Sequence, residues 1–237
     1  MNRILTTCLA IAALCLPIAT AMADGTSEII ASTFGPGDSY NGDAAFYVQN
    51  FPPEETLPDG YEFAHAASFQ PSQSDYLLET TRLSIFRRFN SGGLPRITIS
   101  AADALGGPGP VLASKTISGF VPVDTPFLTE TAPPVAVGWT AEHLTLHAGE
   151  RYWLSLHFPT PTGQEIFWSV SGPEVLGTAA ARGHSYGPPD VWHVFSPATM
   201  PAFSVIGTRV PEPGSLALLS IAGATLAARR RRRPDEK

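Results

Sequence analysis

Five residues in the C-terminal third of the chain have the spacing of a serine nucleophile, Gly183-His184-Ser185-Tyr186-Gly187. A G-x-S-x-G motif works as a nucleophile elbow when a strand precedes it and a helix follows, because that strained turn exposes the serine hydroxyl. Residues 178–182, TAAAR, make a poor strand, and Pro188-Pro189 prevents a helix. We therefore expect a glycine-containing loop here, and a hydrolase that uses Ser185 ranks third among three functional hypotheses.

Two groups of side chains have the chemistry of metal ligands. Asp38, Asn41 and Asp43 could supply oxygen ligands to Ca²⁺, but an Asx turn or an Asn-Gly hairpin explains the same residues without a metal. His143 and His147 have H-x-x-x-H spacing, which needs a helix to place both rings on one face, and the glutamate of a zinc protease motif is missing. We predict no metal site and no cofactor, with calcium left open at the first group.

Aromatic side chains offer a third kind of chemistry, the stacking of sugar rings. Trp153 falls on the outward face of an alternating run, where it could form a carbohydrate platform with one of three others: Trp139, Trp168 or Trp192. The alternative is that these tryptophans pack in the core or at sheet edges. The acidic pair Glu54 and Glu55 lies beside Pro52-Pro53 in an expected loop, and nothing positions it as a glycosidase dyad.

The elements that must position these side chains are all predicted to be strands. Glycine and proline, 21 and 23 of 237 residues, interrupt the chain so often that no helical pattern of about ten residues survives between residues 24 and 208. Alternating runs fill the intervals, at residues 62–69, 80–86, 96–101, 111–117, 143–146, 151–158, 166–170, 191–195 and 202–208. The pattern predicts an all-β domain of about 8–10 strands, an antiparallel sandwich that is either jelly-roll-like or Ig-like.

Residues 146–152, LHAGERY, have the leucine, glycine and tyrosine spacing of a tyrosine corner. In such a corner the tyrosine hydroxyl bonds back to the backbone as the chain crosses between sheets. A hairpin with a three-residue loop is the alternative, and it would gather several outward side chains on one face: His143, His147, Trp153 and His157. We prefer the corner, because a change of sheet explains why Gly149 and Tyr152 are three residues apart, and it divides the histidines between two sheets.

The N-terminus has the features of a secretory signal peptide. Arg3 precedes an apolar run over residues 4–19, and Ala21-Met22-Ala23 is a small-residue site that predicts cleavage by signal peptidase after Ala23. Both cysteines, Cys8 and Cys15, leave with this segment. The mature chain then has no disulfide, thiol or cysteine-zinc chemistry, so its stability must come from its core.

Residues 24–208, 185 in number, are enough for one domain with a substantial core. This segment holds seven basic and eighteen acidic residues, a net charge of about −11, against −6 for the whole chain. An acidic, lysine-poor surface disfavours nucleic acid and direct docking on anionic lipid. The composition suits a secreted, soluble protein.

The tail at residues 210–233 reads VPEPGSLALLSIAGATLAARRRRR and consists of three ordered parts. Val210, Pro211, Glu212 and Pro213 form a stiff, non-helical entry, because proline fixes its own φ and restricts the residue before it. The apolar run at residues 215–228 predicts a helix shorter than the roughly 20 residues of a full membrane span. A basic stop-transfer block follows, and the positive-inside rule keeps it cytoplasmic: Arg229, Arg230, Arg231, Arg232 and Arg233.

This order of proline-flanked glutamate, apolar run and arginine block resembles the PEP-CTERM sorting signal. The resemblance implies a bacterial, exopolysaccharide-associated export route in which a membrane-embedded exosortase recognises residues 210–213 and removes the hydrophobic tail. An ordinary C-terminal anchor is the alternative, and it too places the chain outside the cytoplasm. We divide the chain into a signal peptide at 1–23, a β-sandwich domain at 24–208 and a sorting signal at 209–237.

Within the domain, SGGLPRITISAAD, PVLASKTIS and LHAGERYWLSLHF follow in that order and resemble the secreted domains called choice-of-anchor. That resemblance implies an extracellular β-sandwich and brings no catalytic residues. We expect a protein that is not an enzyme and has a structural or adhesive role in the cell envelope or extracellular matrix. It would be anchored transiently at the inner membrane through its tail and then reach the cell surface or the medium. A carbohydrate-binding module with a polysaccharide partner is the main alternative.

Overall fold

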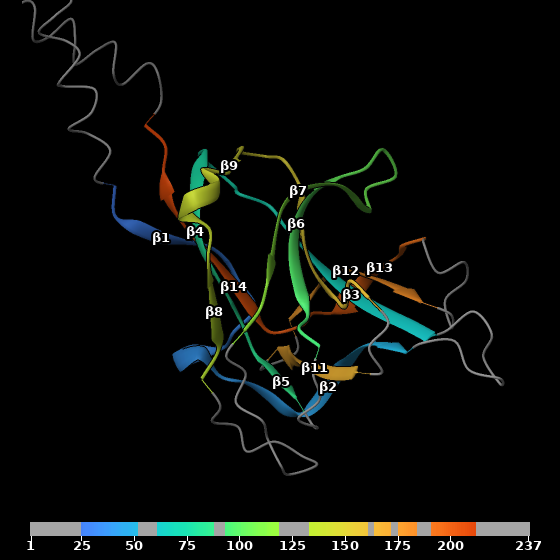
Figure 1. Cartoon of the computed structure of the whole chain (residues 1–237). Helices are drawn as coiled ribbons and strands as arrows, with labels where there is room; N and C mark the ends of the chain where they lie inside the picture. The colour runs from blue at the N-terminus through green and yellow to red at the C-terminus, as the bar shows by residue number, and fades with distance from the viewer. Residues whose placement is uncertain are drawn as a thin grey trace, which may run out of the picture.

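The computed structural model describes residues 25–51, 61–87, 93–118, 133–160, 164–171, 175–183 and 191–211 (Figure 1). These residues form two antiparallel sheets, with strands and two short 3-10 turns as their only regular elements. The prediction of an all-β, antiparallel sandwich is confirmed. The signal helix and the C-terminal hydrophobic helix that the sequence predicts lie outside the described residues.

The smaller sheet has the strand order β1-β14-β4-β8, with β9 also pairing to β4. Its strands are β1 (Ser27–Ser32), β14 (Phe203–Arg209), β4 (Tyr76–Leu83), β8 (Val135–Gly138) and β9 (Thr145–Leu146). The turns η1 (Pro36–Asp38) and η2 (Thr140–Glu142) lie along the connections to β2 and β9. Because β14 pairs with both β1 and β4, the last strand of the domain lies inside this sheet and not at its edge.

The larger sheet has the order β5-β11-β2-β3-β10-β6-β7, and β12 adds to β3 and carries β13. The first four of these are β5 (Ile85–Arg87), β11 (Gln164–Ser171), β2 (Tyr40–Phe51) and β3 (Tyr61–Phe69). The others are β10 (Tyr152–His157), β6 (Arg96–Ala102), β7 (Pro108–Thr116), β12 (Leu176–Gly183) and β13 (His193–Thr199). Figure 1 shows this sheet on the right of and below the smaller one.

The main core fills the space between the sheets. Leu78, Leu83 and Val205 contribute from the smaller sheet, and Leu154 and Ile166 from the larger one. Two fully buried tryptophans also belong to this core, and the ring N–H of each is satisfied, as burial requires. Trp139 donates to the Thr81 hydroxyl and Trp168 donates to the Ala202 carbonyl. Both donor–acceptor distances are 3.0 Å.

A buried joint of Ser84, Ser169 and Ala202 links the two sheets. Ser84 stands between β4 and β5, where the chain passes from one sheet to the other. Its N–H donates to the Ala202 carbonyl (3.1 Å), the Ala202 N–H to the Ser169 carbonyl (2.7 Å) and the Ser169 N–H to the Ser84 carbonyl (2.9 Å). The two serine hydroxyls lie 2.9 Å apart in a further bond. This closed ring gives hydrogen-bond partners to the buried backbone N–H and C=O groups at the point where the chain passes from one sheet to the other.

The predicted strands agree with the structure in the middle of the chain, whereas several strands were missed. Among these, β1, β2 and β8 were not predicted, and β12 covers residues judged a poor strand. Alanine has a low strand propensity, but Ala180 packs against Ala66 and Trp153 on a crowded face where a small side chain fits. The prediction of an Asn-Gly hairpin at Asn41 is wrong, because this residue lies within β2 at a register shift opposite Ser169 and Val170.

The tyrosine corner is confirmed. The chain leaves β9 in the smaller sheet and enters β10 in the larger sheet within residues 146–152. The Tyr152 hydroxyl accepts a bond from the His147 N–H (2.8 Å) and donates to the Glu150 carboxylate (2.9 Å). Asp75 braces the same turn through the Ala148 N–H (2.8 Å) and the His147 ring (2.9 Å).

Replacing Tyr152 with phenylalanine is expected to lower the free energy of unfolding by about 1–2 kcal/mol, because it removes the hydroxyl that serves the His147 N–H. Denaturant unfolding measures the change. The matched control is Tyr47→Phe, at a ring that is 53% exposed, and it should stay within about 0.5 kcal/mol of the parent. Equal stability of the Tyr152→Phe and Tyr47→Phe proteins would contradict a stabilising corner.

The Asp75–His147 pair gives this corner a pH dependence. Hydrogen bonds from the Ala148 N–H and the His147 ring lower the pKa of Asp75 below 3.8, and the bond to Asp75 raises the pKa of His147 above 6.5. The contribution of Asp75 to stability is present above pH 3.8 and is lost as pH falls through its lowered pKa. The contribution of His147 is present below pH 6.5 and is lost as pH rises through its raised pKa.

The difference in unfolding midpoint between the parent and Asp75→Asn should therefore be largest between pH 3.8 and pH 6.5 and smaller at alkaline pH. Thermal unfolding over this pH range measures it. Asp103→Asn is the control, because Asp103 accepts the N–H groups of Leu105 and Gly107 in place of a histidine bond. A difference that stays constant through alkaline pH would show that the histidine adds nothing.

Candidate functional site

The tryptophan platform predicted around Trp153 is not present. Trp153 does point away from the main core, as its alternation predicts, but its side chain is 0% exposed. It forms a second cluster with Ala66 and Ala180, and Trp192 packs against this cluster from the start of β13. Trp139 and Trp168 are also 0% exposed, so neither offers a ring face to a ligand. The alternative, that these tryptophans pack inside the domain, is confirmed for all three, whereas strand alternation alone could not show what covers the outer face of the sheet.

Of the three candidate calcium ligands, Asp38 has another partner in the described structure. The Asp38 carboxylate forms a bidentate salt bridge with the Arg82 guanidinium, with N–O distances of 2.6 and 3.0 Å. Asn41 lies in β2 at its register shift with β11, and the Asp43 side chain is outside the described part of the structure. Among the described residues, no group of three histidine, cysteine, aspartate or glutamate side chains could hold a metal ion.

The two candidate zinc histidines also have separate surroundings. His143 ends the turn η2 in the left-handed region, at φ 49°, whereas His147 bonds to Asp75 in the corner. His157 lies on β10 of the larger sheet, where burial lowers its pKa to about 4, helped by the charges of Arg182 and Arg96. His143 and His147 thus lie in the turns on either side of β9 in the smaller sheet, whereas His157 lies on a strand of the larger sheet.

The G-x-S-x-G segment begins at Gly183, the last residue of β12. That strand is antiparallel to both β3 and β13, so the parallel sheet of an α/β-hydrolase is not what precedes the motif. Residues 184–190, with Ser185, lie outside the described residues, as do Glu54 and Glu55. Gly183 itself needs to be glycine, because its φ is 151° and a Cβ would come within 2.1 Å of the Glu62 carbonyl oxygen.

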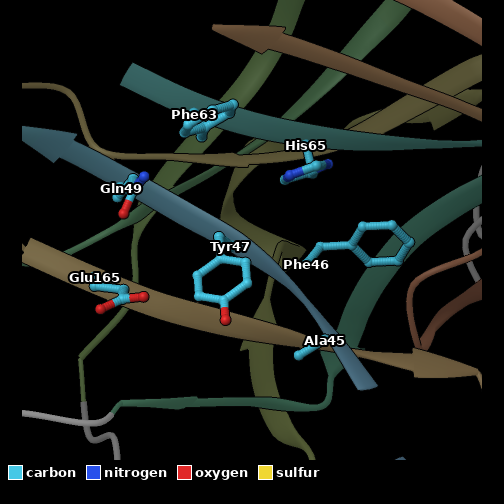
Figure 2. Close-up of a pocket in the computed structure, with 7 residues that line it drawn as sticks. All are labelled: Ala45, Phe46, Tyr47, Gln49, Phe63, His65 and Glu165. Carbon is cyan, nitrogen blue, oxygen red and sulfur yellow. The ribbon is translucent and has the colours of Figure 1, made fainter. Parts of the chain in front are cut away.

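A pocket of about 430 Å³ lies where β2 separates from β3 (Figure 2). The two strands pair only between residues 49–51 and 61–63, whereas β2 continues alongside β11 as far as residue 40. The opening between β2 and β3 is lined by Ala45, Phe46, Tyr47, Gln49, Phe63, His65 and Glu165. We call this set the β2–β3 pocket.

His65 occupies the inner side of the β2–β3 pocket. Burial lowers the pKa of its ring to about 4, and a hydrogen bond to the Tyr47 backbone opposes that effect only in part. The ring therefore stays neutral near pH 7, and it also contacts Phe46, with ring centroids 5.0 Å apart. Its side chain bridges β3 to β2 where the strand ladder between them has opened.

Tyr47, Gln49 and Glu165 also line the pocket, and Figure 2 shows the Tyr47 ring over β11, on the side of β2 away from His65. Gln49 and Glu165 are directly opposite each other on β2 and β11. The Tyr47 ring packs against Phe167 at 4.8 Å, and Phe167 stacks on Phe86 at 4.8 Å and 12°. An exposed aromatic ring and a pair of polar side chains are thus held on two neighbouring strands.

None of these pocket residues was predicted. The alternation of Phe46 and Val48 with Tyr47 and Gln49 is visible in the sequence and would have identified β2. The opening itself could not be read from it, because it depends on where β2 stops pairing with β3.

Most residues predicted to direct export lie outside the described residues, including Ala21, Ala23, Glu212, Pro213 and the five arginines at 229–233. Val210 and Pro211 are described, and the Val210 N–H donates to the Asp75 carbonyl over 2.8 Å. No helix among the described residues is long and apolar enough to cross a membrane.

Comparison of the sequence with curated proteins found no match. Two solved structures are similar, one described as the structure of infectious bursal disease virus Gt strain and one as the 2.6A structure of Infectious Bursal Virus Derived T=1 Particles. Their identities are 16% and 10% and their TM-scores 0.29 and 0.21, and the matches cover 79% and 88% of this chain. They span only 38% and 48% of the viral chains, and similarity at this level carries no functional argument.

One protein-family model matches, and it covers the tail. The model describes the PEP-CTERM protein-sorting motif and matches residues 209–233, within a residue of the boundaries expected from the proline, apolar and arginine parts. The chain therefore carries a PEP-CTERM sorting motif, which implies sorting by an exosortase and a destination at the cell surface or outside the cell.

Proposed function

We propose that this protein is an exported, non-enzymatic component of the cell envelope or extracellular matrix with a structural or adhesive role. The observation that carries the proposal is the sorting motif at residues 209–233, which begins at the last residue of β14. Signal peptidase would remove residues 1–23, and the exosortase would release the domain from a transient inner-membrane stage. The five arginines would hold the tail in the membrane until then.

The way the tail leaves the domain supports its removal. Strand β14 is paired on both sides, and the Val210 N–H bond to Asp75 follows directly after it. The side chain of the same Asp75 braces the tyrosine corner. The tail therefore starts from a fixed point of the sandwich, and cleavage near Pro213 leaves β14 and the Val210 bond to Asp75 in the retained chain.

The surroundings of the candidate metal ligands, of the pocket and of the G-x-S-x-G segment support a role without catalysis. Asp38 is engaged by Arg82, and His147 by Asp75. The β2–β3 pocket has one carboxylate among its described lining residues, whereas glycosidases generally use two. An antiparallel strand ending in a strained glycine also differs from the strand that a serine nucleophile elbow requires.

The exported protein is expected to begin at Asp24 and end near Pro213. Intact-mass spectrometry of the protein from the outer compartment measures both ends. Replacing Pro211, Glu212 and Pro213 by alanine should keep the tail on the chain, and replacing Pro108 and Pro110 in β7 is the control. A native protein recovered intact through Lys237 from that compartment would refute processing.

A chain that ends at Pro213 should unfold at the same midpoint as one that continues to Lys237, because it keeps all of β14 and the Val210 N–H bond to Asp75. A chain that ends at Pro201 should fail to fold, because it loses β14 together with the buried Phe203 and Val205. Circular dichroism during thermal unfolding distinguishes the two. A marked loss of stability in the chain ending at Pro213 would mean that the tail belongs to the folded unit.

A further inference from the structure

We propose that the β2–β3 pocket binds one ring of an uncharged sugar. The inference goes beyond the proposed role, because it concerns the sandwich and not the sorting motif. It would give an adhesive protein a ligand.

The first support is the shape of the pocket. At about 430 Å³ it falls within the range of small-molecule sites, roughly 300–1,000 Å³. It forms where β2 stays paired with β11 but stops pairing with β3 at Gln49 and Phe63. Because strand pairing forms the opening, the pocket exists before any ligand arrives, and little entropy is lost in shaping it.

The second support is an aromatic ring held in place at the surface. Tyr47 is 53% exposed, yet its ring rests against Phe167, which is itself buried and stacked on Phe86. A ring fixed in this way presents apolar surface at low cost, and its hydroxyl adds a polar contact. The C–H face of a sugar ring is a suitable partner for such a surface.

The third support is the polar pair beside that ring. Gln49 and Glu165 face each other across the β2–β11 ladder, so their side chains reach the same side of the sheet. The amide supplies both donors and an acceptor, and the carboxylate supplies two acceptor oxygens. Adjacent hydroxyls of a sugar can donate to the carboxylate while others bond to the amide, an arrangement that needs several hydroxyls on one small ring.

Charge selects among sugars. The described lining residues contain one formal charge near pH 7, the Glu165 carboxylate, since burial keeps His65 neutral. An anionic ring such as a uronic acid would be disfavoured by the net charge of about −11 that residues 24–208 carry. With a single carboxylate in the lining, the pocket is built to hold a sugar and not to hydrolyse it.

The exported protein can be tested by saturation-transfer-difference NMR and calorimetry with maltose, cellobiose, lactose and glucuronate. At least one of the three uncharged disaccharides should bind, and glucuronate should bind at least about tenfold more weakly. Tyr47→Ala should weaken binding about tenfold, and Glu165→Gln, which keeps the side-chain shape, several-fold. Phe195→Ala, at an aromatic residue that is 40% exposed on β13, is the control and should bind like the parent.

Three results would overturn the proposal: no binding by any of the uncharged disaccharides, unchanged binding in both Tyr47→Ala and Glu165→Gln, or glucuronate binding as tight as that of the neutral sugars. Unfolding midpoints of the variants confirm that a loss of binding is not a loss of fold. The mass test of the tail is independent, since it depends on residues 209–233. Failure of the sugar test therefore leaves the proposed export and processing unaffected.

Discussion

The buried ring of hydrogen bonds among Ser84, Ser169 and Ala202 is the contact on which the rest of the sandwich depends. It joins the start of β14 in one sheet to β11 in the other, at the residue where β4 passes into β5. Because the sequence has no cysteine after residue 23, no disulfide holds the two sheets together. Breaking a buried backbone bond here would leave an unsatisfied group at a cost of about 1–3 kcal/mol. The joint also holds β11 in position, and β11 carries Phe167, against which the Tyr47 ring packs.

The features that could be predicted from the sequence are those with a local physical cause. Frequent glycine and proline, with short alternating runs between them, determine an antiparallel all-β chain. The tyrosine corner was also predictable, because a loop of fixed length and a hydroxyl within reach of its own backbone specify it completely. The sorting motif was predictable for the same reason, as proline stiffness, an apolar run and a basic block are properties of consecutive residues.

The features that could not be predicted depend on contacts between distant segments. Trp153 alternates outward as expected, but Trp192 and the alanines of β12 cover it, and nothing near residue 153 indicates this. The β2–β3 pocket has the same origin, since it arises where two pairing partners of β2 diverge. Strand alternation identifies the face on which a side chain lies, whereas only long-range pairing decides whether that face is open.

The arrangement separates the two tasks of the chain. The tail follows β14 of the smaller sheet, whereas every described residue that lines the pocket lies on β2, β3 or β11 of the larger one. Residue Asp75 ties the tail's exit to the tyrosine corner, which is the crossing between the sheets. The proposed cleavage near Pro213 therefore lies C-terminal to every described residue that lines the pocket. The proposed processing and the proposed sugar binding can thus be altered by separate substitutions, because the sorting motif and the pocket lining share no residue.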